Sequence, residues 1–199
     1  MPYSAEEVQK IAGIYGITLP SDTVNLRENA TEKHLRKMDL TRYRILHFAT
    51  HAIVGDEVRW ITQPALVLSL AGTDDTYDGF LQMNEIFNLR LDADLVVLSA
   101  CETGKGKLRR GEGIIGLTRA FMYAGTPSVV ASLWKVNDQS TSLFMEFFYQ
   151  NLKDGQSKAD ALQQAKKQLM QAQIEIAGQK RSLAAPYFWA PFILIGSGN

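Results

Sequence analysis

Five short apolar runs recur along the chain, and each has the β-branched and aromatic content that is typical of a β-strand. These runs are Tyr43–Ala49, Ala65–Leu70, Asp94–Ser99, Ser128–Trp134 and Phe192–Ile195. The third and fourth are apolar without alternation, as expected of strands that are covered on both faces of a sheet. The pattern therefore predicts a well-buried sheet.

Between the later runs, apolar positions recur with helical spacing. The predicted helices are Ile114–Ala124, a second that begins at Asp138 or Ser140 and runs to about Lys153, and a third from Ser157 to about Ile174. Two shorter helices are predicted before residue 43, and Gly178–Ala185 is interpreted as a loose basic loop. Strands that alternate with helices predict a three-layer α/β/α fold with a mostly parallel central sheet.

The length and composition fit one soluble domain. The 199 residues divide into a helical N-terminal part over residues 1–42 and an α/β core over residues 43–199, and 46% of the chain is hydrophobic. Basic and acidic side chains, 21 of each, cancel, so no overall field attracts nucleic acid or lipid. The apolar runs are far shorter than the roughly 20 residues that span a bilayer. We therefore expect no nucleic acid and no membrane among the partners.

Two reactive side chains follow predicted strand ends. His51 comes two residues after the strand that ends at Ala49, and Cys101 comes two residues after the strand that ends at Ser99. Ligands bind at the carboxyl ends of parallel strands, because the loops there converge on one crevice. If the two strands are neighbours, their backbones lie about 4.8 Å apart, and an imidazole and a thiol on these loops come within reach of each other. This arrangement suits nucleophilic catalysis, in which the imidazole takes the proton of the thiol.

Other interpretations of these residues remain open at this point. A lone cysteine at a strand end is more often an inert, buried small hydrophobe. His47 lies within its predicted strand and is interpreted as structural, while His34 is expected to be solvated. One cysteine and three scattered histidines have no spacing that suits a metal, and we expect neither a metal nor an organic cofactor. The single cysteine excludes an intrachain disulfide, and without a signal-peptide pattern we expect a cytoplasmic protein.

Five motifs in consistent order resemble those of CHAT-domain proteins, which are relatives of caspases, separases and gingipains. The motifs are YRILHFATHA at Tyr43–Ala52, LVVLSACETG at Leu95–Gly104, RGEGIIGLTRAFMYAG at Arg110–Gly125, VVASLWKVND at Val129–Asp138 and PYFWAPFILIG at Pro186–Gly196. The resemblance covers about four-fifths of the chain and is strongest from residue 43 onwards. It implies a caspase-like fold and identifies residues 43–199 as the core of a cysteine endopeptidase.

The resemblance also implies roles for single residues. The second histidine of the HFATH run is of the catalytic type, which gives that role to His51 and the role of nucleophile to Cys101. The backbone amides of Cys101 and Ala52 are the candidates for an oxyanion hole. The family usually has glycine at the position of Ala52, and a backbone that needs a positive φ would be strained there by alanine.

Four further residues are candidates for the substrate pocket: Ser99, Glu112, Trp134 and Asp138. Ser99 stands where some metacaspase-like relatives carry an aspartate that receives a basic P1 side chain, so strong selectivity for arginine or lysine is less expected here. Core packing for Trp134, a helix N-cap for Asp138 and a favourable helix-dipole contact for Glu112 are the alternative interpretations.

The leading hypothesis is an endopeptidase that cleaves a protein or peptide substrate at a specific residue under the control of a partner or signal. Similar proteins often carry this domain at the C-terminal end of a longer chain, so a helical-repeat domain or partner protein is the expected regulator. One alternative is a catalytically silent scaffold with the same fold, which Ala52 favours. Another is a nucleotide or phosphate binder, although the glycines from Gly104 to Gly116 lack the spacing of a phosphate loop.

Overall fold

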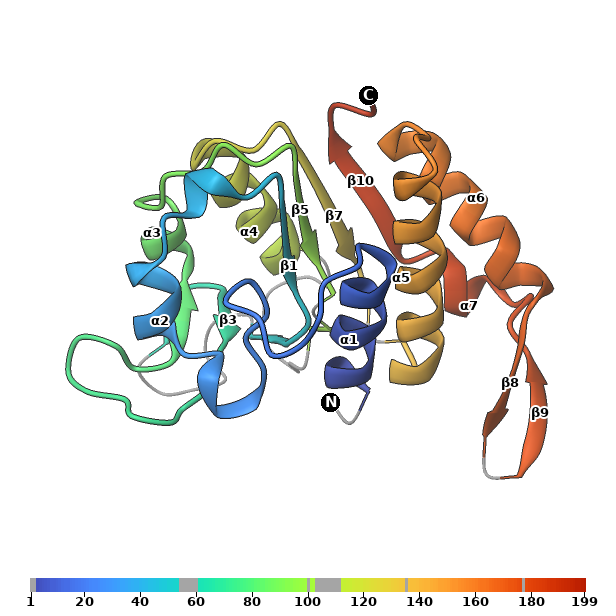
Figure 1. The fold of residues 1–199 in the computed structure, drawn as a ribbon, viewed down its shortest axis with the longest axis horizontal. Helices are drawn as coiled ribbons and strands as arrows, with labels where there is room; N and C mark the ends of the chain where they lie inside the picture. Colours follow the sequence, from blue (N-terminus) through green and yellow to red (C-terminus); the bar gives the residue numbers. More distant parts are fainter. Residues whose placement is uncertain (1–2, 54–60, 100, 103–111, 135, 177) are drawn as a thin grey trace. The chain divides into compact units, whose positions relative to one another are not determined.

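The computed structural model describes residues 3–53, 61–99, 101–102, 112–134, 136–176 and 178–199 (Figure 1). They form two compact units. One unit combines Met1–Val24 with Val136–Asn199, and the other is Asn25–Lys135. The predicted division at residue 42/43 does not coincide with these units, because Asn25–Lys135 includes the last helical turns of the N-terminal part.

Parallel strands form the centre of the Asn25–Lys135 unit. β1 (Ile45–Phe48), β5 (Leu95–Leu98) and β7 (Ser128–Ser132) lie in the order β1-β5-β7. The register places Phe48 beside Leu98 and Leu98 beside Ala131. β5 has the sequence LVVL and is almost completely buried, because it has a neighbouring strand on each side. The predicted α/β class with a mostly parallel central sheet is therefore confirmed.

A second, smaller sheet lies in the same unit. Its order is β4 (Phe80–Gln82), β3 (Ala65–Val67), β2 (His51–Ile53) and β6 (Cys101–Glu102). β3 is antiparallel to both β2 and β4, whereas β2 and β6 are parallel. The run that predicted a strand from Ala65 therefore forms part of this mixed sheet.

Short helices and one long helix cover these strands. The unit contains the 3₁₀ turns η1 (Arg27–Asn29) and η2 (Leu40–Arg42) and the helices α2 (Glu32–Lys37), α3 (Met83–Ile86) and α4 (Glu112–Tyr123). α4 lies against β7 and contributes Leu117 and Phe121 to the core. The ring of Phe121 is 5.4 Å from that of Phe48 in β1, so the long helix and the central strands share one apolar core.

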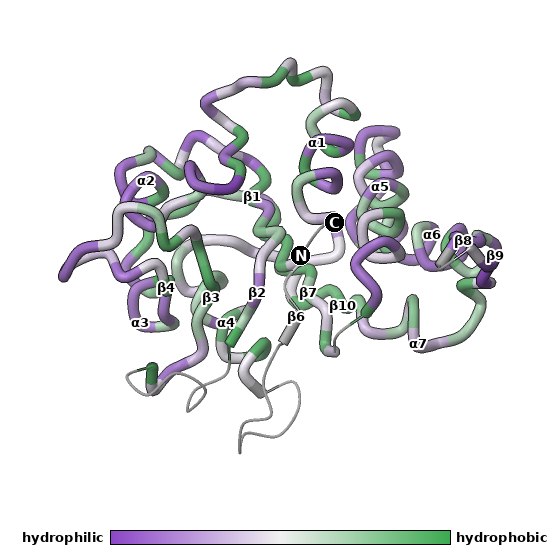
Figure 2. Tube along the Cα trace, turned by 90° about the horizontal axis from the view of Figure 1, so that it is seen from below, coloured by the Kyte–Doolittle hydropathy of each residue, from purple (hydrophilic) through white to green (hydrophobic). Residues whose placement is uncertain are grey.

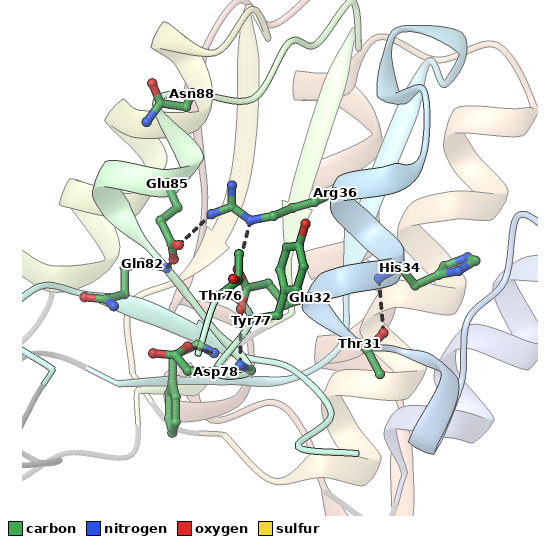
Figure 3. A network of polar contacts seen from close by, with 12 residues as sticks. Thr31, Glu32, His34, Arg36, Thr76, Tyr77, Asp78, Gln82, Glu85 and Asn88 are labelled. Atoms are coloured by element: carbon green, nitrogen blue, oxygen red, sulfur yellow. Dashed lines mark hydrogen bonds and ion pairs between the residues drawn. The ribbon is translucent and has the colours of Figure 1, made fainter. Parts of the chain in front are cut away.

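A network of hydrogen bonds and ion pairs joins α2 to the residues before and after β4, in the second sheet (Figure 3). The Glu32 side chain is only 1% exposed and accepts hydrogen bonds from Arg36 Nε at 2.8 Å and from the Gly79 N–H at 3.1 Å. Arg36 also bonds Glu85 at 2.6 Å, and Glu85 accepts the N–H of Gln82. Burial raises the pKa of the Glu32 carboxyl, whereas the Gly79 N–H and the Arg36 guanidinium act in the opposite direction.

The other unit contains α1 (Ser4–Ile14), α5 (Asp138–Lys153), α6 (Lys158–Gln171), α7 (Pro186–Trp189) and the strands β8 (Gln173–Ile176), β9 (Gln179–Ser182) and β10 (Phe192–Gly196). α5 packs against both α1 and α6. Ring stacking of Phe144 on Phe192, with centroids 3.7 Å apart, joins α5 to β10. The aromatic side of α5 is therefore core.

Two predictions for this unit are wrong. The helix predicted to reach Ile174 ends at Gln171, and the segment interpreted as a loose loop contains β9. β8 and β9 form an antiparallel hairpin with Glu175 opposite Lys180, and Figure 2 shows β9 as hydrophilic. A strand whose side chains all face solvent has no apolar alternation, so the pattern could not reveal it.

The predicted starts near Ser157 and Asp138 are confirmed. Ser157 caps α6 by accepting the N–H of Asp160, and in the Asn25–Lys135 unit Thr31 caps α2 by accepting the N–H of His34. For α5 the cap is Asn137, whose side chain accepts the N–H groups of residues 139 and 140, so Asp138 is the first residue inside the helix. No helix within the described ranges is long and apolar enough to cross a bilayer.

Candidate active site

Two neighbouring strands each break for two residues and then resume. β1 ends at Phe48 and β2 begins at His51, while β5 ends at Leu98 and β6 begins at Cys101. Phe48 is in register with Leu98 before the break, and His51 is in register with Cys101 after it. Partners are fifty positions apart in both pairs, so the register is the same on the two sides of the break. Figure 2 shows β2 and β6 next to each other.

The register brings together the backbones of the two predicted catalytic residues. Register partners on adjacent strands lie about 4.8 Å apart. The sequence predicts that His51 and Cys101 lie on loops, whereas each is the first residue of a short strand. A strand holds a backbone more rigidly than a loop because hydrogen bonds to its neighbours fix its φ and ψ angles.

His51 stands between two strands. Cys101 of β6 is its partner on one side, and Val67 of β3 is its partner on the other. The residue is half-buried, and its Nδ1 atom is screened from solvent. The position therefore combines a fixed backbone with a partly shielded imidazole, which is an environment suited to proton transfer.

Ala52 occupies an extended position in β2, so the positive φ at which alanine would be strained is not present. Arg27 is the only non-glycine residue with a positive φ among those that the structure describes, so alanine fits the backbone at position 52. Its side chain is completely buried, and it is in register with Leu66 of β3 and Glu102 of β6. The predicted role of the Ala52 N–H in an oxyanion hole stays a prediction.

Substitution of Ala52 by glycine is expected to destabilise the protein by about 1–2 kcal/mol, because it removes a buried methyl group and loosens a three-residue strand. Chemical denaturation measures the loss. We expect no increase in peptide cleavage, because no backbone strain is relieved. Faster cleavage by Ala52→Gly would show that alanine limits the site after all.

The four pocket candidates have different surroundings. Ser99 directly follows β5 and is 1% exposed, and its hydroxyl has no hydrogen-bond partner within the described part of the chain. Trp134 is half-buried two residues after β7, and its carbonyl accepts the Ser132 hydroxyl at 2.9 Å. Glu112 is the first residue of α4. These three belong to the unit that contains His51, whereas Asp138 belongs to the other unit.

One residue beside the histidine was not predicted from the sequence. The Thr50 hydroxyl donates a hydrogen bond to the carbonyl oxygen of Val67, which is the register partner of His51. The Glu32–Arg36–Glu85 network was not predicted either, although the i,i+4 spacing of Glu32 and Arg36 was an available signal. For Thr50 the sequence contained no signal, because the partner is a backbone atom 17 residues away.

Comparisons with known proteins give the chain a family. The family model described as "CHAT domain" matches residues 1–197. Tetratricopeptide repeat protein 28 of Homo sapiens is 28% identical over 232 aligned residues, which cover 99% of this chain and 8% of that protein. The protein of the same name from Mus musculus is 33% identical over 113 residues, which cover 57% of this chain and 4% of that protein. The chain thus spans less than a tenth of the length of these curated relatives.

Proposed function

The chain belongs to the CHAT domain family, and on this premise we propose that it is a cysteine endopeptidase in which Cys101 is the nucleophile and His51 the base. One observation carries the proposal: His51 and Cys101 are register partners on parallel strands. Register partners on adjacent strands have neighbouring backbones, about 4.8 Å apart. This proximity supports a role of both residues in one reaction.

The chemistry follows from these two groups. His51 takes the thiol proton, and the resulting thiolate attacks the carbonyl carbon of the peptide bond. Collapse of the tetrahedral intermediate breaks the C–N bond, and the imidazolium gives its proton to the leaving amine. Water then attacks the thioester with the imidazole as base, which releases the carboxyl product and restores the thiol. The Cys101 backbone N–H is the first candidate for the oxyanion contact, because it belongs to the residue that carries the nucleophile, and the Ala52 N–H is the second.

The proposed substrate is a protein with an uncharged residue before the cleaved bond. Ser99 is buried directly ahead of the Cys101 segment, and a neutral hydroxyl there offers a hydrogen bond but no countercharge for arginine or lysine. Two curated relatives are named for tetratricopeptide repeats, which supports control by a helical-repeat domain or partner. A reducing compartment such as the cytoplasm would keep the single thiol active.

A silent scaffold is the less well supported function. Its main support in the sequence is the alanine that follows the histidine, and that support weakens because Ala52 fits an unstrained strand. The alignment of His51 with Cys101 is also a feature that a scaffold does not require.

Alkylation of the thiol tests the proposal without knowledge of the substrate. Because Cys101 is the only cysteine, the rate of iodoacetamide labelling reports on this thiol alone. An unperturbed thiol with a pKa near 8.5 is only about 1% ionised at pH 6.5, whereas a thiol paired with imidazole is largely ionised. We therefore expect His51→Ala to slow labelling at pH 6.5 by about tenfold or more, measured by mass spectrometry.

His34→Ala is the matched control, because His34 lies exposed on α2. It should label at the rate of the unaltered chain. Slow labelling of the unaltered chain that does not change in His51→Ala would contradict the enzyme and support the scaffold.

A further inference from the structure

A side-chain hydrogen bond joins the start of β2 to β3. Thr50 directly precedes His51, and its hydroxyl donates a hydrogen bond to the carbonyl oxygen of Val67 in β3. Val67 is also the register partner of His51 in the antiparallel β2–β3 pair. The bond therefore joins the two strands at the residue that carries the imidazole.

His51 is the first residue of β2. The strand is three residues long, and β6 on its other side has only two. The chain has just crossed a two-residue break from β1, so His51 is the first residue that can pair again. A short strand frays most easily at its ends. A side-chain bond at this end restricts the backbone where fraying would displace the imidazole.

We propose that Thr50 is a positioning residue for His51: its hydroxyl bond to Val67 holds the start of β2 in the register that aligns His51 with Cys101. The inference rests on the proposed function and adds to it a residue that does not touch the substrate. A displacement of a catalytic group by about 1 Å lowers rates by up to about 100-fold, so a single anchoring bond at this place is sufficient to affect the reaction.

The test compares Thr50→Val, which keeps the shape and loses the donor, with Thr50→Ser, which keeps the donor. Thr50→Val should lower the rate of Cys101 alkylation at pH 6.5 by about three- to tenfold and lower kcat for a cleaved peptide with little change in KM. Thr50→Ser should restore most of both rates. This rescue distinguishes the hydroxyl from the methyl group and from the bulk of the side chain.

Thr126→Val is the matched control. The Thr126 hydroxyl donates to the carbonyl of Ser128 at 3.1 Å, so the variant also removes a hydroxyl-to-carbonyl bond from the same unit. Thr126 lies just before β7, at the amino end of the parallel strands, whereas His51 follows the carboxyl end of β1. Thr126→Val should lower the melting temperature without slowing alkylation of the folded protein.

Two results would overturn the inference. The first is an alkylation rate and a kcat in Thr50→Val equal to those of the parent, when labelling of the parent depends on His51. This result would leave the proposed function intact. The other is an equal loss in Thr50→Val and Thr126→Val that follows melting temperature alone. If labelling of the parent does not depend on His51, the proposed function and the positioning role both fail.

Discussion

Replacement of Cys101 by alanine should abolish peptide cleavage, with a loss of at least about a thousandfold, while the protein stays folded. In the proposed mechanism the thiolate forms the thioester, and neither the imidazole nor the oxyanion contact can replace it. Alanine keeps the Cβ atom and the backbone of β6, so we expect the free energy of unfolding to change by less than about 1 kcal/mol. Proteome-wide profiling of cleavage sites, with the parent beside Cys101→Ala, measures the loss and reads out the P1 residue together.

Cys101→Ser provides the second variant, because it keeps a smaller and weaker nucleophile at the same place. It should retain only a trace of cleavage, since a serine hydroxyl is far less ionised than a thiol near neutral pH. The same set of cleaved sites with both variants and with the parent would refute the assignment of the nucleophile. A P1 set dominated by arginine or lysine would leave the nucleophile in place and contradict the neutral pocket proposed around Ser99.

Gly125→Ala should be the most destabilising single methyl addition that the structure identifies in the described residues, with a loss of about 3 kcal/mol or more. Gly125 has a φ of +122°, where alanine is strained. An added Cβ would stand 2.2 Å from the carbonyl oxygen of Leu91. The Leu91 N–H donates to the Ala124 carbonyl at 2.9 Å, so backbone approaches backbone at this point and neither side can yield by rotating a side chain.

This close approach matters for the site as well as for stability. It joins the end of α4 to the segment that leads into β5, the strand that continues toward Cys101. Chemical denaturation should therefore show a lower midpoint for Gly125→Ala, and alkylation of Cys101 should lose part of its dependence on His51.

Gly13→Ala is the matched control for the same chemical change. Gly13 lies in α1, and an added carbon there meets nothing within 4 Å. Alanine favours the helix over glycine by up to about 1 kcal/mol, so this variant should be as stable as the parent or slightly more stable. An unchanged denaturation midpoint in Gly125→Ala would mean that Leu91 and Gly125 are not held as closely as the structure places them.

The strands and helices that could be predicted are those with a buried face. β5 and β7 are apolar throughout, and α5 shows an aromatic stripe, because burial in one core selects apolar side chains at regular spacing. The strands that were not predicted lack such a regular apolar pattern. β6 has two residues and β9 is fully exposed, so one is too short and the other too polar for a period to appear.

For the candidate site, too, some features could be predicted from the sequence and others depend on the tertiary structure. The sequence alone identified the two proposed catalytic residues, since His51 and Cys101 follow apolar runs and the chain contains a single thiol. The tertiary structure decided that the two backbones are in register, that Ala52 is unstrained and that Thr50 bonds Val67. Those three facts depend on pairing between segments 17 to 50 positions apart. Such pairing leaves no local pattern, because the partner of each residue is chosen by the packing of the whole sheet.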